Sequence, residues 1–132
     1  MIKLCDFIGW FFTFNYLYLI INGKILYENI LYGGIRMVTN NLLIKLKERS
    51  DNEIEKVKDL LLSMDGKIPA LISIKVETDI RGPEKSSYDI MLITQFYEFG
   101  DLNEYLNHPV HIEVSEYIKK VMDIGASLCY ES

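Results

Sequence analysis

Three side chains that can hold or exchange a proton lie close together in the last third of the chain. Tyr105, His108 and His111 follow one another at three-residue steps, as Tyr-x-x-His-Pro-x-His. An imidazole titrates near neutral pH, so His111 could act as a general acid or base with the Tyr105 hydroxyl as its partner. The alternative is that His111 is a hydrogen-bonded residue at the edge of a helix and sheet core.

His108 precedes Pro109, and a histidine at this place is typical of a helix cap or of loop packing. We include His108 among the candidate ligand-binding residues, with a helix cap or loop packing as the alternative. Two histidines three residues apart, with Asp101 and Glu104 nearby, could also indicate a metal site. A third close nitrogen or sulfur ligand is missing from this stretch. We therefore expect no metal and no cofactor.

Asn40 is a further candidate, because it interrupts an apolar pattern. It falls on the same face of an alternating strand as Val38 and Leu42, where a polar amide needs a hydrogen-bonding partner. An asparagine can orient a ligand carbonyl but cannot exchange a proton. We also consider Tyr88 and Phe96 as ligand-binding residues, with the alternative that they are ordinary core and interface aromatics.

Apolar periodicity, capping signals and turn residues define the elements that must position these side chains. The pattern predicts strands over residues 38–46, 72–77, 88–99 and 124–130. It predicts a first helix over residues 51–64, opened by a capping box at Ser50. A short helix capped by Asp101 and Glu104 and a longer one from Pro109 follow. Gly100 is expected to end the third strand.

The order strand, helix, strand, strand, helix, strand is a split βαβ pattern, which predicts a ferredoxin-like α+β fold. The two central strands are apolar on both faces, whereas the helices of such a domain cover only one face of its sheet. We therefore expect the second face to pack on the sheet of an identical subunit in a two-fold homodimer. The charged residues at the end of the first strand, Lys45, Lys47 and Arg49, are interpreted as exposed-strand charge on a solvated surface.

The composition fits one small domain and argues against several classes of partner. The chain has 132 residues, 49% of them hydrophobic, and a formal charge of -5. Residues 37–132 hold 17 acidic and 11 basic side chains, and this negative excess repels nucleic acid. Cys5 and Cys129 are the two cysteines, too few for a disulfide scaffold. We therefore expect a reducing, cytoplasmic compartment.

Residues 1–36 form an apolar N-terminal extension with nine of the sixteen aromatic residues. The uncharged stretch over residues 7–23 is just long enough to span a bilayer, so a membrane-prone or packing helix is one interpretation. The other is a leader translated from an upstream start. Codons for Gly33 and Gly34 can form a ribosome-binding site before Met37, which would then be the true first residue. We expect membrane association only if the extension is a genuine anchor.

Residues 37–132 resemble the stress-responsive dimeric α/β-barrel (Dabb) family. The similarity rests on residues 37–47, on the turn over residues 66–69 and, most specifically, on the motif from Tyr105 to His111. It implies homodimers whose sheets face one another to form a barrel, with a small-molecule cavity between sheet and helices.

The resemblance leaves two functions open. In the first, the cavity binds a small apolar or carbonyl-bearing metabolite without turnover. In the second, the protein is a lyase or cyclase that acts on a polyketide-like substrate, and His111 and Tyr105 form the acid–base pair of the cyclase-like plant members. Those members carry a histidine where this chain has Asn40, a departure that favours binding alone.

Overall fold

The computed structural model describes residues 11–13, 16–21, 24–28, 36–82, 84 and 87–132. The chain divides into two compact units, Met1–Ile35 and Arg36–Ser132. Each unit is described by itself below.

The described part of the first unit is a three-stranded antiparallel sheet in the order β1-β2-β3. Its strands are β1 (Phe11–Thr13), β2 (Tyr16–Ile21) and β3 (Lys24–Glu28). The interpretation of this stretch as a helix is therefore wrong for the described residues. The sequence signal for a hairpin is Asn-Gly at 22–23 between two runs rich in β-branched and aromatic residues.

Two further expectations concern the extension. Among the described residues, no helix has both the length and the apolar character needed to cross a bilayer. The interpretation as a translated leader depends on Gly33 and Gly34, which lie outside the described residues, and it stays a prediction.

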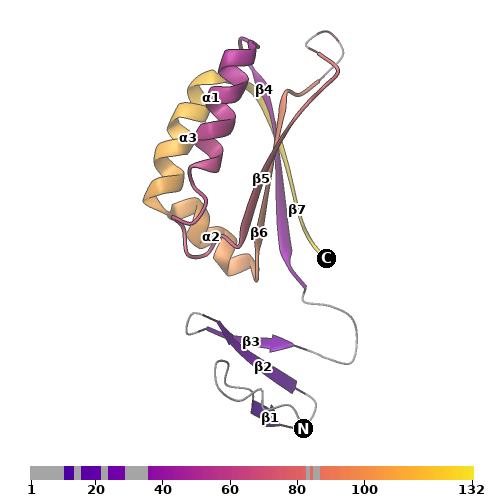
Figure 1. The fold of residues 1–132 in the computed structure, drawn as a ribbon, viewed down its shortest axis with the longest axis vertical. Helices are drawn as coiled ribbons and strands as arrows, with labels where there is room; N and C mark the ends of the chain where they lie inside the picture. Colours follow the sequence, from indigo (N-terminus) through magenta and orange to yellow (C-terminus); the bar gives the residue numbers. More distant parts are fainter. Residues whose placement is uncertain (1–10, 14–15, 22–23, 29–35, 83, 85–86) are drawn as a thin grey trace. The chain divides into compact units, whose positions relative to one another are not determined.

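The second unit is a four-stranded antiparallel sheet with helices on one face (Figure 1). The strand order is β5-β6-β4-β7, from β4 (Val38–Leu46), β5 (Ser73–Thr78), β6 (Ile90–Phe96) and β7 (Met122–Glu131). The helices are α1 (Asp51–Leu62), α2 (Phe99–Asn107) and α3 (Pro109–Val121). This confirms the ferredoxin-like α+β fold, with β4 and β6 in the centre of the sheet.

Two helix starts follow from their caps. The Ser50 hydroxyl accepts a hydrogen bond from the Glu53 amide at 3.1 Å, as expected for a capping residue. The Glu53 carboxylate accepts a second hydrogen bond from the Tyr117 hydroxyl at 2.8 Å, which links α1 to α3. At the start of α3, Nδ1 of His108 accepts from the amide of Val110 at 3.2 Å. This confirms the interpretation of His108 as a helix cap.

The connection between β6 and α2 differs from the prediction. The strand ends at Phe96 because its partner in the register is Val38, the first residue of β4. Helix α2 then begins at Phe99, with Glu98 at the N-cap and Gly100 inside the first turn. The expected strand end at Gly100 and the expected cap at Asp101 are therefore wrong. Asp101 is buried within α2, where it is 3% exposed.

One hydrophobic core lies between the sheet and the three helices. Alternation along β4 and β6 directs every second side chain toward the helices. The largest fully buried apolar side chains come from all layers of the domain: Tyr105, Phe96, Ile44, Leu61, Met64, Ile90 and Val57.

None of the helices among the described residues of this unit lies on the opposite face of the sheet (Figure 1). We call it the open face, and its members on the central and edge strands are paired in the register: Asn41 with Leu128, Leu43 with Ala126 and Met91, and Lys45 with Ile124. Leu128 is 65% exposed, and Ile124 is 52% exposed. Large apolar side chains thus face solvent on a surface that the core does not use.

Candidate functional site

Three rings from three elements meet at one end of the helix layer. The ring of Phe96, the last residue of β6, lies 5.2 Å from the ring of Tyr105 on α2, measured between centroids. The ring of Tyr105 lies 4.5 Å from that of His111 on α3, at an interplanar angle of 52°. The predicted pair of Tyr105 and His111 is therefore brought together in space, ring against ring.

The Tyr105 hydroxyl is enclosed by the core. The side chain is 2% exposed, and the hydroxyl lies 4.0 Å from Sδ of Met64, a weak acceptor. Burial raises the pKa of Tyr105 to about 12. At neutral pH this phenol stays protonated, so it cannot serve as a base.

His111 occupies a different environment at the rim of the core. Its side chain is half-buried, and Nδ1 lies 3.1 Å from the carbonyl oxygen of Leu106. Since a carbonyl can only accept, Nδ1 carries the proton and donates it. Burial lowers the pKa of His111, partly opposed by this hydrogen bond, so the imidazole is neutral at pH 7. In that tautomer Nε2 is an acceptor, and no described residue bonds to it.

Asn40 lies near the start of β4, on the face that the helices cover. Its neighbours in the register are Thr94 on β6 and Cys129 on β7. The Thr94 hydroxyl donates to the backbone oxygen of Asn40 at 3.3 Å, and Thr94 is fully buried. The Asn40 side chain is only partly buried, and its amide makes no hydrogen bond with any described residue. The amide is therefore available to a ligand.

Asn40 and His111 lie toward the same end of the domain, because Phe96, which packs on Tyr105 and through it reaches His111, pairs with Val38 at the start of β4. The amide of Lys47, just after β4, donates to the carbonyl of Val121 at 2.9 Å, which fixes the end of α3 beside the end of β4. His111 precedes Val121 by about 15 Å at a helical rise of about 1.5 Å per residue. At about 3.3 Å per residue, the same distance back from Lys47 along β4 is about 4.5 residues and reaches the level of Leu42 and Leu43.

Packed core side chains fill the space beneath Asn40 and His111. Phe96 is 0% exposed and packs on Tyr105, so it takes the core role that was the alternative to ligand binding. Asn40 and His111 therefore lie at the rim of a packed layer and do not open into a chamber lined by Phe96. Met64 and the Leu106 carbonyl are parts of this arrangement that the sequence did not indicate, because both act through tertiary contacts.

Tyr88 is not part of this group. It lies just before β6, at the opposite end of that strand from Phe96. There it lines a concavity of about 350 Å³, together with nine other residues: Leu43, Glu77, Thr78, Asp79, Arg81, Ser87, Asp89, Ile90 and Met91. The structure thus places Tyr88 away from Phe96 and Asn40, the other residues that we considered as ligand-binding candidates on the strands.

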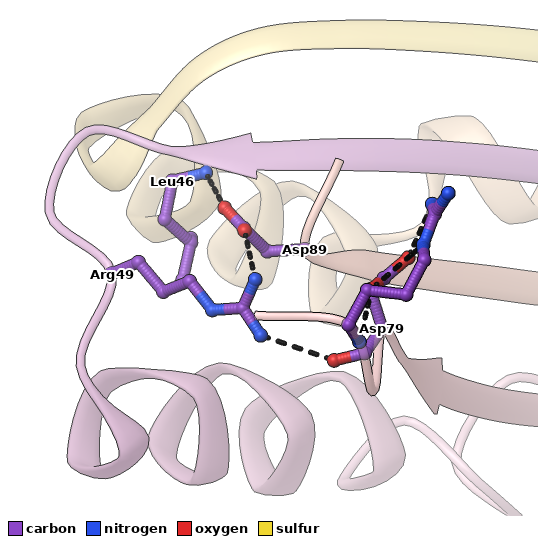
Figure 2. A network of polar contacts seen from close by, with 5 residues as sticks. Leu46, Arg49, Asp79 and Asp89 are labelled. Atoms are coloured by element: carbon purple, nitrogen blue, oxygen red, sulfur yellow. Dashed lines mark hydrogen bonds and ion pairs between the residues drawn. The ribbon is translucent and has the colours of Figure 1, made fainter. Parts of the chain in front are cut away.

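A buried ion pair fixes this second end of the sheet (Figure 2). Asp89, which is 1% exposed, accepts hydrogen bonds from the Leu46 amide at 2.8 Å and from Nη1 of Arg49 at 3.0 Å. Nη2 of Arg49 donates to the backbone oxygen of Asp79 at 3.0 Å. The interpretation of Arg49 as solvated surface is therefore wrong, because its guanidinium ties the end of β4 to both ends of the β5–β6 loop.

Comparison with protein families now adds an independent observation. The model of the stress responsive A/B barrel domain, Dabb, matches residues 38–131, which is most of the chain. The chain belongs to the Dabb family. Among curated proteins, none matches this Dabb chain.

Solved structures share the fold of this Dabb domain at low sequence identity. A dimeric ferredoxin-like protein of unknown function from Bacteroides fragilis is 22% identical, with a TM-score of 0.63, over 73% of this chain and 96% of that one. A second dimeric ferredoxin-like protein of unknown function, from Thermobifida fusca, is 16% identical with a TM-score of 0.65, over 77% and 96%. The hydroxynitrile lyase from Passiflora edulis is 14% identical with a TM-score of 0.64, over 75% and 95%.

Proposed function

We propose that this chain is a homodimeric Dabb protein that binds a small, uncharged molecule bearing a carbonyl or hydroxyl group, without turning it over. The observation that carries the proposal is the pair of unused polar groups at one end of the helix layer. The Asn40 amide and Nε2 of His111 are both partly buried and have no partner among the described residues.

The chemistry of these two groups favours a neutral ligand. An amide offers two donors and an acceptor, so Asn40 can hold a carbonyl or a hydroxyl. Nε2 of neutral His111 accepts a hydrogen bond, which suits a hydroxyl donor. Neither side chain brings a charge to neutralise, so binding an anion here would leave a partly desolvated charge without compensation.

The homodimer in this proposal uses the open face. Leu128, Ile124 and Tyr130 are 65%, 52% and 44% exposed on β7, and all three lie on that face by their register with β4. Burying such a surface against an identical sheet removes apolar area from water. The dimeric state of two proteins with the same fold supports this arrangement. The exposed free thiol of Cys129 fits a reducing, cytoplasmic location.

A second candidate function is cleavage of a hydroxynitrile, and one observation favours it. Nε2 of His111 is free to take the proton of a substrate hydroxyl. As that proton leaves, the oxygen's electron pair forms the carbonyl, the carbon–carbon bond to the nitrile breaks, and cyanide departs. The fold shared with a hydroxynitrile lyase supports testing this reaction. The buried Tyr105 hydroxyl weighs against an acid–base pair, because it lies against Met64.

The two candidates are separated by one titration with benzaldehyde and mandelonitrile as probes. Binding is followed by NMR of the His111 ring and the Asn40 side-chain amide, and cleavage by release of benzaldehyde. We expect both probes to bind without cleavage. Asn40→Ala should weaken binding of both probes about tenfold, and His111→Gln should weaken binding of mandelonitrile, whose hydroxyl can donate to Nε2, whereas the matched surface variant Asn52→Ala should change neither. Benzaldehyde release that is lost in His111→Gln would establish the lyase instead.

A further inference from the structure

We propose that the outer surface of α2 and α3 is a docking site for a basic amphipathic segment of another protein. Its apolar centre consists of Phe99, Leu106 and Ile112. Its rim consists of four exposed glutamates, and we call the whole surface the acid-rimmed patch: Glu98, Glu104, Glu113 and Glu116.

The apolar centre is more exposed than the fold requires. Phe99 is 59%, Leu106 43% and Ile112 45% exposed. Phe99 and Leu106 are two helical turns apart on α2, so they lie along one stripe of that helix. Leu106 and Ile112 flank the corner at His108 where α2 gives way to α3. Exposed large apolar side chains on neighbouring helices are typical of an interaction surface.

The position of the patch keeps it accessible in the proposed dimer. All three helices lie on one side of the sheet, and the open face lies on the other (Figure 1). Packing two open faces together therefore leaves α2 and α3 outside the interface. A protein partner can reach the patch without competing with dimerisation.

The charges of the patch identify the partner by complementarity. The four exposed glutamates of the patch outnumber the two basic residues of α2 and α3, Lys119 and Lys120, which lie in the last turn of α3 about two turns beyond Ile112. An acidic rim repels anionic lipid and a second acidic copy of this chain, and it attracts lysine and arginine. An amphipathic helix with basic side chains beside apolar anchors matches both features.

The patch also shares backbone with the candidate site. The carbonyl of Leu106 accepts the hydrogen bond from Nδ1 of His111, and Ile112 is the residue after His111. A segment seated on Leu106 and Ile112 would change the solvent exposure around this hydrogen bond. Docking should therefore shift the NMR signals of the His111 ring, which a purely long-range attraction would leave in place.

The test uses the full chain and a fluorescent helical peptide of leucine and lysine, with a leucine and glutamate peptide as its control. Fluorescence anisotropy should show binding of the lysine peptide alone, weakening between about 50 and about 300 mM NaCl. Leu106→Ala and Ile112→Ala should each weaken binding of the lysine peptide at least about fivefold. The control is Ile80→Ala, which removes an apolar side chain that is 98% exposed outside the patch, and it should leave binding unchanged. Glu113→Gln should reduce the salt dependence, and Glu55→Gln on α1 should not.

Several results would overturn the proposal. Equal binding of the two peptides, or an equal loss of affinity in Ile80→Ala and Ile112→Ala, would indicate nonspecific binding to the protein surface. Higher oligomers that disappear in Ile112→Ala would assign the patch to a second copy of this chain. Binding to phosphatidylcholine vesicles without binding to the lysine peptide would assign it to a lipid surface.

Discussion

The ring of Tyr105 lies 4.5 Å from the ring of His111, but the Tyr105 hydroxyl contacts Sδ of Met64 at 4.0 Å. The two residues therefore share a packing contact between their rings. His111 makes its polar contact elsewhere, with the Leu106 carbonyl. In this arrangement Tyr105 supports the imidazole from within the core, and of these two residues His111 is the one that presents an unused polar atom at the rim.

The Tyr105 hydroxyl should contribute little to stability. In Tyr105→Phe the ring contacts remain and one weak hydrogen bond to sulfur is lost, so we expect a change below about 1 kcal/mol in the free energy of unfolding. Tyr105→Ala removes a 2% exposed ring and should cost about 3 to 5 kcal/mol. Urea unfolding measures both. A large loss in Tyr105→Phe would show that the hydroxyl has a stronger partner than Met64.

The titration of His111 should make the fold less stable in mild acid. Burial lowers its pKa in the folded state below the unfolded value of about 6.5. Between these two values the unfolded chain binds more protons, so stability falls as the pH drops below about 6.5 and levels off below the folded pKa. Ring proton NMR measures this pKa directly.

The matched variant for that prediction is His111→Gln, which cannot titrate. The difference in unfolding free energy between the parent chain and the variant should shrink as the pH falls from 7.5 toward 5, through the window below about 6.5. His108 caps α3 in both proteins, so the comparison isolates the change at position 111. A difference that is constant over this range would contradict the direction of the His111 shift.

The fold could be predicted because its signals are local and repeat along the chain. Val38, Ile44 and Leu46 alternate with polar residues, and Pro109 marks the start of a helix. The boundary between β6 and α2 could not be predicted, since the strand ends where its partner β4 begins at Val38, a tertiary fact. In the extension, uninterrupted apolar character obscured the hairpin signal at residues 22–23.

The ion pair between Arg49 and Asp89 should be the polar interaction most important to the second end of the sheet. Asp89→Ala leaves a guanidinium that is only 15% exposed without its carboxylate and removes the acceptor for the Leu46 amide. We expect a loss of about 3 kcal/mol in the free energy of unfolding. The control is Glu77→Gln, which breaks the exposed pair with Lys75 and should change stability far less. Similar losses in both variants would contradict this assignment.

The open face should control the oligomeric state. Leu128→Glu places a charge on a 65% exposed apolar residue of that face, and burying this charge in an interface is unfavourable. We expect sedimentation equilibrium to report a monomer for Leu128→Glu and a dimer for Ile80→Glu, whose side chain lies in the β5–β6 loop. A dimer that persists in Leu128→Glu would move the interface to another surface.

The candidate site was predictable only in part. The motif identified Tyr105 and His111, and strand parity placed Asn40 on the helix side, where the register confirms it. The hydrogen-bonding partner of each polar group could not be predicted, because that partner is distant in the sequence or lies on the backbone. Met64 lies 41 positions from Tyr105, yet it is the residue that the phenol contacts.

The most direct test of the central claim is native mass spectrometry of the protein purified from its own host. A homodimer that retains a small neutral molecule has about twice the 15.4 kDa chain mass plus that of the ligand. We expect this complex from the parent chain and a ligand-free dimer from Asn40→Ala. A monomer without any retained molecule, at every concentration at which the chain is folded, would contradict the account.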